Sequence, residues 1–115
     1  MSDDRRKFPR KYLTFFGRVF ERDTGQLIGQ MADVTPQGAM IISGRPLELD
    51  QDFQLRLDLP ETIFEQDHMD FDARSVWCQP DLEPSLFNTG FQLLNMTPEK
   101  VAIVEQIIKE FGIRG

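Results

Sequence analysis

Residues 53–60 read Phe-Gln-Leu-Arg-Leu-Asp-Leu-Pro. Apolar side chains occupy every second position, which is typical of a β-strand that buries one face, and the proline ends the pattern. Residues 69–77 repeat this period, from Met69 to Trp77. The two segments therefore predict two strands with one face in the core, and we expect Trp77 to be a core residue.

Four further segments are rich in β-forming residues, namely residues 12–21, 26–34, 39–43 and 87–94. Turn-forming residues at 23–25 and 35–38 separate the first three of them, which predicts two tight connections. A loop with two prolines is expected at residues 79–85. Gly90, inside the last segment, indicates a bulge or a close approach of the backbone to a neighbour.

The pattern changes to a helical period after residue 96. Thr97, Pro98 and Glu99 form a helix start, with threonine as the N-cap and proline in the first helical position. Apolar residues then recur at helical spacing, at Val101, Val104, Ile107, Ile108 and Phe111. Gly112 ends the helix. The sequence therefore predicts an all-β fold, a six-stranded antiparallel β-barrel with a C-terminal α-helix packed on it.

The composition is that of a single cytosolic domain. The chain has 115 residues, of which 40% are hydrophobic, enough for one core. No apolar run approaches the roughly 20 residues of a membrane helix, and no secretory signal follows the N-terminal charges. We therefore expect no membrane insertion. Cys78 is the sole cysteine, which fits a reducing, cytoplasmic location.

Charge is distributed unevenly along the chain. Residues 1–11 carry five basic and two acidic side chains, a net charge of +3, so the remainder must carry −9 for a total of −6. Such an acidic body would repel a long polyanion, and we expect no nucleic-acid polymer as a partner. The basic segment favours a small, compact anion, although a solvated terminus without a ligand fits the charge equally well.

Histidine and cysteine, two residue types that often support catalysis or metal binding, each occur once. His68 is the sole histidine and lies ten residues from Cys78, which is poor material for a zinc site or a Cys–His pair. We expect His68 at the surface and Cys78 as a small buried hydrophobic residue. Phosphate-binding glycine loops of the Walker or Rossmann kind do not occur. The sequence therefore predicts no enzyme, no catalytic residue and no metal site.

Two short motifs point to a known family. The N-terminal segment Arg5-Arg6-Lys7-Phe8-Pro9-Arg10 contains an RxxxR pattern. The segment Asp33-Val34-Thr35-Pro36-Gln37-Gly38 follows a [D/N]x[S/A]xxG pattern except at its third position. Together with the strand pattern and the capped terminal helix, they resemble the PilZ family from Arg5 to about Phe111. The resemblance implies a split barrel that binds cyclic di-GMP on its outer surface, with the N-terminal arm folded over the ligand.

The resemblance also implies roles for individual residues. Arg6 and Arg10 would hold phosphate and guanine groups, because a guanidinium donates in bidentate fashion and stacks on a flat base. Asp33 would accept hydrogen bonds from the guanine N1 and N2 donors, or would only cap its own turn. Gly38 would permit the turn and a close approach of the backbone.

Two positions modify this picture. Thr35 stands where the family most often has serine, so the hydroxyl is kept but the added methyl group is expected to lower the affinity without abolishing binding. Arg5, directly before the motif, is a further candidate contact. We expect it to favour two intercalated ligand molecules over one.

We therefore expect two parts, a flexible basic arm over residues 1–11 and a barrel with its helix over residues 12–115. The expected function is that of a cyclic di-GMP receptor whose arm changes conformation on binding and which signals to an unidentified protein partner, in bacterial motility, surface polymer production or biofilm control. Two alternatives stay open. One is a PilZ-fold interaction module without nucleotide binding, as in type IV pilus assembly. The other is an RNA-binding small barrel, although its expected basic, aromatic-rich face is missing.

Overall fold

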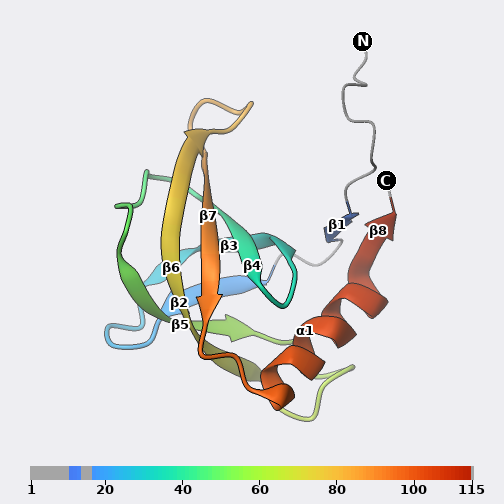
Figure 1. Ribbon diagram of the computed structural model, residues 1–115. Coiled ribbons are helices and arrows are strands. Elements are labelled where there is room, and N and C mark those ends of the chain that lie inside the picture. Colours follow the sequence, from blue (N-terminus) through green and yellow to red (C-terminus); the bar gives the residue numbers. More distant parts are fainter. Residues whose placement is uncertain (1–10, 14–16, 115) are drawn as a thin grey trace.

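The computed structural model describes residues 11–13 and 17–114, and six of its strands close into an antiparallel barrel (Figure 1). The barrel strands are β2 (Arg18–Glu21), β3 (Leu27–Val34), β4 (Gly38–Ser43), β5 (Asp52–Asp58), β6 (His68–Pro80) and β7 (Phe87–Leu94). Their order around the barrel is β2-β3-β4-β7-β6-β5, and pairing of β2 with β5 closes the sheet. Closure leaves no unpaired strand edge in the barrel. The prediction of a six-stranded antiparallel barrel is confirmed.

The alternating pattern of β5 and β6 fills the barrel interior. Leu55 pairs with Phe71 and Leu57 with Met69, and all four side chains are buried at 3% exposure or less. The intervening residues of both strands face outward or are half-buried. Residue period and burial agree here because each strand buries a single face.

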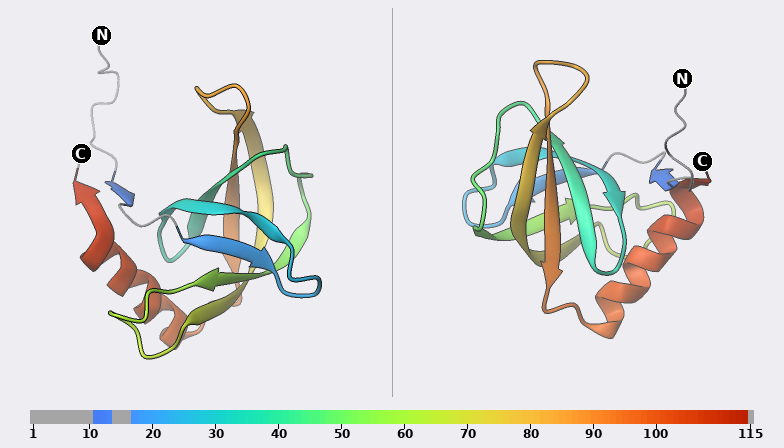
Figure 2. Two further views of the ribbon diagram at one scale, coloured as in Figure 1. Left: turned by 180° about the vertical axis from the view of Figure 1, so that it is seen from behind. Right: turned by 45° about the horizontal axis from the view of Figure 1, so that its top comes forward.

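Helix α1 (Pro98–Phe111) shares this core. The Thr97 hydroxyl caps the helix by accepting a hydrogen bond from the Lys100 N–H at 3.2 Å, as expected from the sequence. Val104 and Ile107 are fully buried and belong to the same hydrophobic cluster as the barrel interior. Figure 2 shows the helix lying alongside the barrel, so its apolar face completes the core on that side.

A short ribbon outside the barrel differs from the sequence prediction. Residues 12–21 were expected to form one strand, but β1 (Lys11–Leu13) pairs with β8 (Gly112–Arg114), directly after the helix. β2, unlike β1, pairs within the barrel, where its neighbours are β3 and β5. The single-strand prediction was wrong because β-forming composition reveals a strand but not its partner. β1 also lies against β3.

The β6–β7 hairpin extends well beyond the rest of the barrel (Figure 1). β6 continues to Pro80, where it pairs with Phe87, so the loop predicted at residues 79–85 starts two residues later. The long hairpin supplies one wall of the site described next and carries an exposed loop at its tip.

Candidate functional site

A β-bulge decides the orientation of Asp33. Met31 pairs with Ile41 and Asp33 pairs with Met40, so Ala32 is an extra residue in β3. Met31 and Ala32 are both buried, whereas Asp33 is half-buried on the outer side of the barrel. Without the extra residue Asp33 would share the inward phase of Met31, since side chains alternate along a strand. The bulge therefore brings this carboxylate to the outer surface.

The Thr35 hydroxyl holds the turn that follows β3. Its oxygen accepts hydrogen bonds from the N–H groups of Gln37 at 3.2 Å and Gly38 at 3.1 Å. The Thr35 N–H in turn donates to the Gly38 carbonyl at 2.8 Å. A second backbone bond, from the Leu93 N–H to the Gln37 carbonyl at 2.9 Å, fastens the turn to β7. The hydroxyl that threonine shares with serine is thus used to build the turn.

Gly38 lies at a close approach between two strands. A Cβ at this position would lie 3.0 Å from the Phe91 carbonyl oxygen in the neighbouring strand β7. The backbone φ of Gly38 is not positive. Among the described glycines, Gly25 has the positive φ of the left-handed region. The close packing expected at Gly38 is therefore a contact with the chain itself.

A second bulge corrects the prediction for Trp77. Ser75 pairs with Phe91 and Trp77 pairs with Gly90, so Val76 is an extra residue in β6. Ser75 is fully buried, whereas Trp77 is 39% exposed. The expectation that Trp77 is a core residue was wrong, because the bulge moves it out of the inward phase that Met69 to Ser75 follow. The indole lies instead on Gly90, where a Cβ would collide with the indole nitrogen.

These elements converge on one shallow pocket of about 240 Å³ on the barrel surface. Its lining includes the predicted residues Asp33, Thr35 and Gly38, together with Trp77 and Gly90. A carboxylate that accepts hydrogen bonds and an indole face suited to stacking are complementary to a flat base that carries N–H donors. Pockets for drug-sized ligands usually span about 300–1,000 Å³, so this pocket by itself is smaller than such a ligand requires.

The remaining predicted site residues, Arg5, Arg6 and Arg10, lie outside the described residues. Trp77 is the site residue that the sequence reasoning missed. The available signal was Gly90, which indicated a close approach whose partner is this indole.

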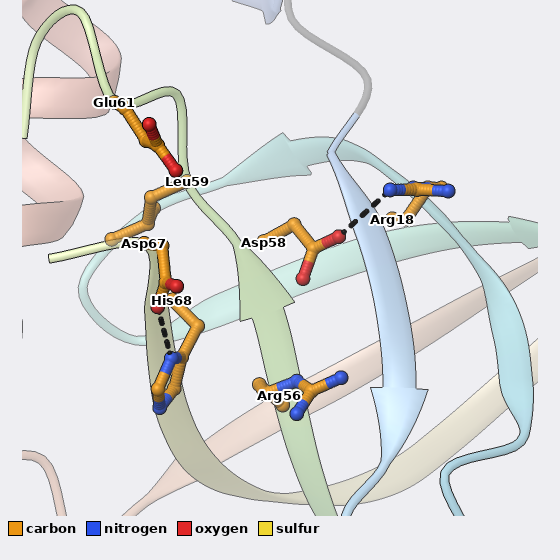
Figure 3. Close-up of a pocket in the computed structure, with 7 residues that line it drawn as sticks. All are labelled: Arg18, Arg56, Asp58, Leu59, Glu61, Asp67 and His68. Atoms are coloured by element: carbon orange, nitrogen blue, oxygen red, sulfur yellow. Dashed lines mark hydrogen bonds and ion pairs between the residues drawn. The ribbon is translucent and has the colours of Figure 1, made fainter.

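A larger pocket of about 420 Å³ lies on another part of the barrel, at β2, β5 and the start of β6 (Figure 3). Arg18 pairs there with Asp58 at 3.2 Å, and His68 Nδ1 lies 2.6 Å from an Asp67 carboxylate oxygen. The hydrogen bond from His68 lowers the pKa of Asp67. With Glu61 and Arg56, the pocket is lined by three carboxylates and two guanidiniums. The carboxylates outnumber the guanidiniums, which does not favour a dianionic nucleotide. His68 is exposed, as expected.

Over residues 11–13 and 17–114, the structure contains no group of three or more His, Cys, Asp or Glu side chains able to hold a metal.

Cys78 is half-buried, which is less than the burial expected from the sequence. Its sulfur accepts a hydrogen bond from the Thr89 hydroxyl at 3.4 Å. Within the described part of the chain, no helix has the length and apolar character needed to span a bilayer.

The family model of the PilZ domain matches residues 4–110. The chain belongs to the PilZ domain family. This confirms the resemblance drawn from the two motifs and the strand pattern. No curated protein matches the chain in sequence.

Two solved structures share the PilZ fold with this chain. The inhibitor of motility MotI/DgrA from Bacillus subtilis aligns with a TM-score of 0.66 at 13% identity, over 87% of this chain and 50% of MotI. The chain thus spans half the length of MotI. The PilZ domain of YcgR from Escherichia coli, solved with c-di-GMP, aligns with a TM-score of 0.64 at 14% identity, over 90% of this chain and 89% of that domain. At these identities the likeness establishes the fold.

Proposed function

We propose that this PilZ protein is a cyclic di-GMP receptor that has no enzymatic activity and signals to a protein partner. The observation that carries the proposal is the convergence of Asp33 and Trp77 on one pocket, each turned outward by a bulge. The YcgR domain of the same family, solved with c-di-GMP, supports the choice of ligand. The proposed setting is the bacterial cytoplasm, and the proposed processes are motility, surface polymer production or biofilm control.

Each residue of the site has a proposed contact. Asp33 accepts hydrogen bonds from a guanine N1 and N2, which selects guanine over adenine. Trp77 stacks on a base, as aromatic side chains do in many nucleotide sites. Arg6 and Arg10 donate to phosphate oxygens or a guanine edge. Thr35 and Gly38 shape the turn that the ligand contacts.

The arm at residues 1–11 is the proposed moving part, and residues 12–115 form the receptor body. β1 begins at Lys11, the residue after Arg10, and lies against β3. Lys11, the residue after Arg10, therefore belongs to a strand that lies next to the strand carrying Asp33. Ordering of the arm around the dinucleotide changes the surface that a partner meets.

Calorimetric titration with cyclic di-GMP tests the proposal. We expect wild type to bind, Arg10→Ala to lose about tenfold or more in affinity, and Arg10→Lys to recover only part of it because lysine lacks the planar fork. Cyclic di-AMP serves as the matched ligand control. Asp33→Asn should reduce the ratio of the affinity for cyclic di-GMP to the affinity for cyclic di-AMP. An absence of heat with wild type would contradict the proposal and favour the alternative of a PilZ-fold interaction module without a nucleotide.

The same titration addresses the number of ligands. With Arg5 as a contact to a second guanine, we expect two intercalated molecules per chain in wild type and fewer in Arg5→Ala. A stoichiometry near one in wild type, or an unchanged value in the variant, would remove this role for Arg5.

A further inference from the structure

The loop at the tip of the β6–β7 hairpin presents a leucine wholly to solvent. Leu82 has a relative exposure of 101%, whereas the other exposed large hydrophobic residues of the described chain lie between 39% and 50%. Partly exposed apolar residues are ordinary on a protein surface. A leucine with no cover at all, on a loop that projects beyond the barrel (Figure 1), is a different case because it contributes nothing to the core.

Hydrogen bonds hold this loop in one shape. The Asp81 N–H donates to the Leu86 carbonyl at 2.9 Å, and the Leu86 N–H donates to the Glu83 carbonyl at 3.0 Å. The Asp81 carboxylate accepts from the Glu83 N–H at 3.1 Å and from the Asn88 amide at 2.9 Å. The Glu83 carboxylate accepts from the N–H and hydroxyl of Ser85 at 3.2 and 2.7 Å. A loop already ordered loses less conformational entropy when it binds.

The loop is also uniformly acidic. No lysine or arginine occurs between Arg74 and Lys100, so Asp81 and Glu83 flank Leu82 without a nearby basic residue in sequence. The hydrogen bond from Asn88 lowers the pKa of Asp81, and the hydrogen bonds from Ser85 lower the pKa of Glu83. Both groups are therefore anionic at neutral pH, which disfavours a nucleic acid or an anionic membrane as the contact.

We propose that Leu82 and its two flanking carboxylates form a docking surface for a protein partner that offers an apolar pocket rimmed by lysine or arginine. An apolar anchor within a charged, solvent-exposed rim is a common arrangement of protein interfaces. The docking surface supplies a contact for the protein partner of the proposed function, but it does not itself require nucleotide binding.

A coupling between the docking surface and nucleotide binding rests on the proposed function. Trp77 and Leu82 belong to the same hairpin, five residues apart in sequence. The paired segment from Trp77–Gly90 to Pro80–Phe87 connects the nucleotide pocket to the loop without interruption. A ligand on Trp77 thus contacts the strand that leads into the docking loop.

Site-specific photo-crosslinking identifies the partner. A photo-reactive residue at Pro84, in the loop, is compared in the native cells with one at Thr62, an exposed position between β5 and β6. The captured protein is then purified and titrated against wild type, Leu82→Ser and Leu27→Ser. Leu27 is 50% exposed and is the matched control for loss of a surface leucine.

We expect capture from position 84 but not from position 62, and a loss of about tenfold or more in affinity for Leu82→Ser with no loss for Leu27→Ser. The variant Glu83→Gln removes one charge, and its amide oxygen can still accept both hydrogen bonds from Ser85. It should slow association and weaken the dependence of association on salt. No capture at position 84, or equal binding of Leu82→Ser and wild type, would overturn the docking proposal.

Parallel titrations with cyclic di-GMP separate the two proposals. Leu82→Ser should bind the nucleotide like wild type. Partner binding that depends on Leu82 in a protein that binds no nucleotide would contradict the proposed function and leave the docking surface intact.

Discussion

The indole of Trp77 lies directly on Gly90 of the neighbouring strand, in a space that any side chain at position 90 would fill. The ring is 39% exposed while Gly90 is buried beneath it. A glycine opposite an aromatic residue lets the ring lie close to the sheet and covers the backbone of the glycine. The exposed aromatic face is thereby held in place at the pocket that also contains Asp33.

Gly90→Ala should displace the indole. The new methyl group overlaps the ring, so we expect the free energy of unfolding to fall by about 1–3 kcal/mol. Trp77 is the sole tryptophan, so its fluorescence should shift as the ring moves into water. Urea denaturation followed by fluorescence measures both effects. Gly44→Ala is the control, because a Cβ there meets no atom within 4 Å. Equal stability of the two variants would contradict the packing described.

Trp77→Ala should weaken cyclic di-GMP binding more than it weakens the fold. Base stacking on an aromatic side chain contributes about 1–3 kcal/mol, so the dissociation constant should rise between about 5-fold and 150-fold. Trp77→Phe should retain part of the affinity. Leu49→Ala, at a residue that is 44% exposed, controls for the loss of exposed apolar surface. Calorimetry gives the affinities, and an alanine variant that binds like wild type would exclude stacking.

Thr35→Ala should loosen the turn between β3 and β4. Two backbone N–H groups lose their acceptor, so we expect a loss of about 1 kcal/mol in unfolding free energy. Thr35→Ser keeps the hydroxyl and should remain near wild type in stability while binding cyclic di-GMP more tightly. Chemical denaturation and calorimetry test the two parts separately. A serine variant as unstable as the alanine variant would show that the methyl group, rather than the hydroxyl, supports the turn.

Asn88→Ala should raise the pKa of Asp81. The Asn88 amide donates to the Asp81 carboxylate and lowers its pKa below the ordinary value of 3.8. A pKa lowered in the folded state gives a stabilisation that is present above the ordinary value and is lost as the pH falls through the lower folded value. The pKa of Asp81 is measured in both proteins by following its carboxyl carbon chemical shift by NMR as the pH is lowered. The pKa of Asp52, lowered mainly by its hydrogen bond with Arg74, should stay constant in the variant.

The structure agrees with the sequence prediction where the signal is local. Leu55 and Leu57 are buried as their alternation predicts, because a strand that covers one core has a fixed period. Thr97 caps the helix that its neighbours predict, and Ile107 lies in the core. These features depend on a few adjacent residues and on whether a side chain faces the core or the solvent.

The sequence prediction failed where the outcome depends on a distant strand. The composition of residues 12–21 indicates β-structure but does not reveal that Lys11–Leu13 pairs with the segment after the helix. Likewise, the alternation from Met69 to Ser75 predicts Trp77 inside the barrel, and the shift in register against β7 reverses that outcome.

The sequence by itself determined the family, the number of barrel strands, the helix and the turn at residues 35–38. Only the tertiary structure decided that Asp33 and Trp77 face outward into one pocket and that Leu82 stands free at the hairpin tip. The physical reason is that a bulge is a property of two paired strands, so the direction of a side chain beyond it follows from the register with its partner.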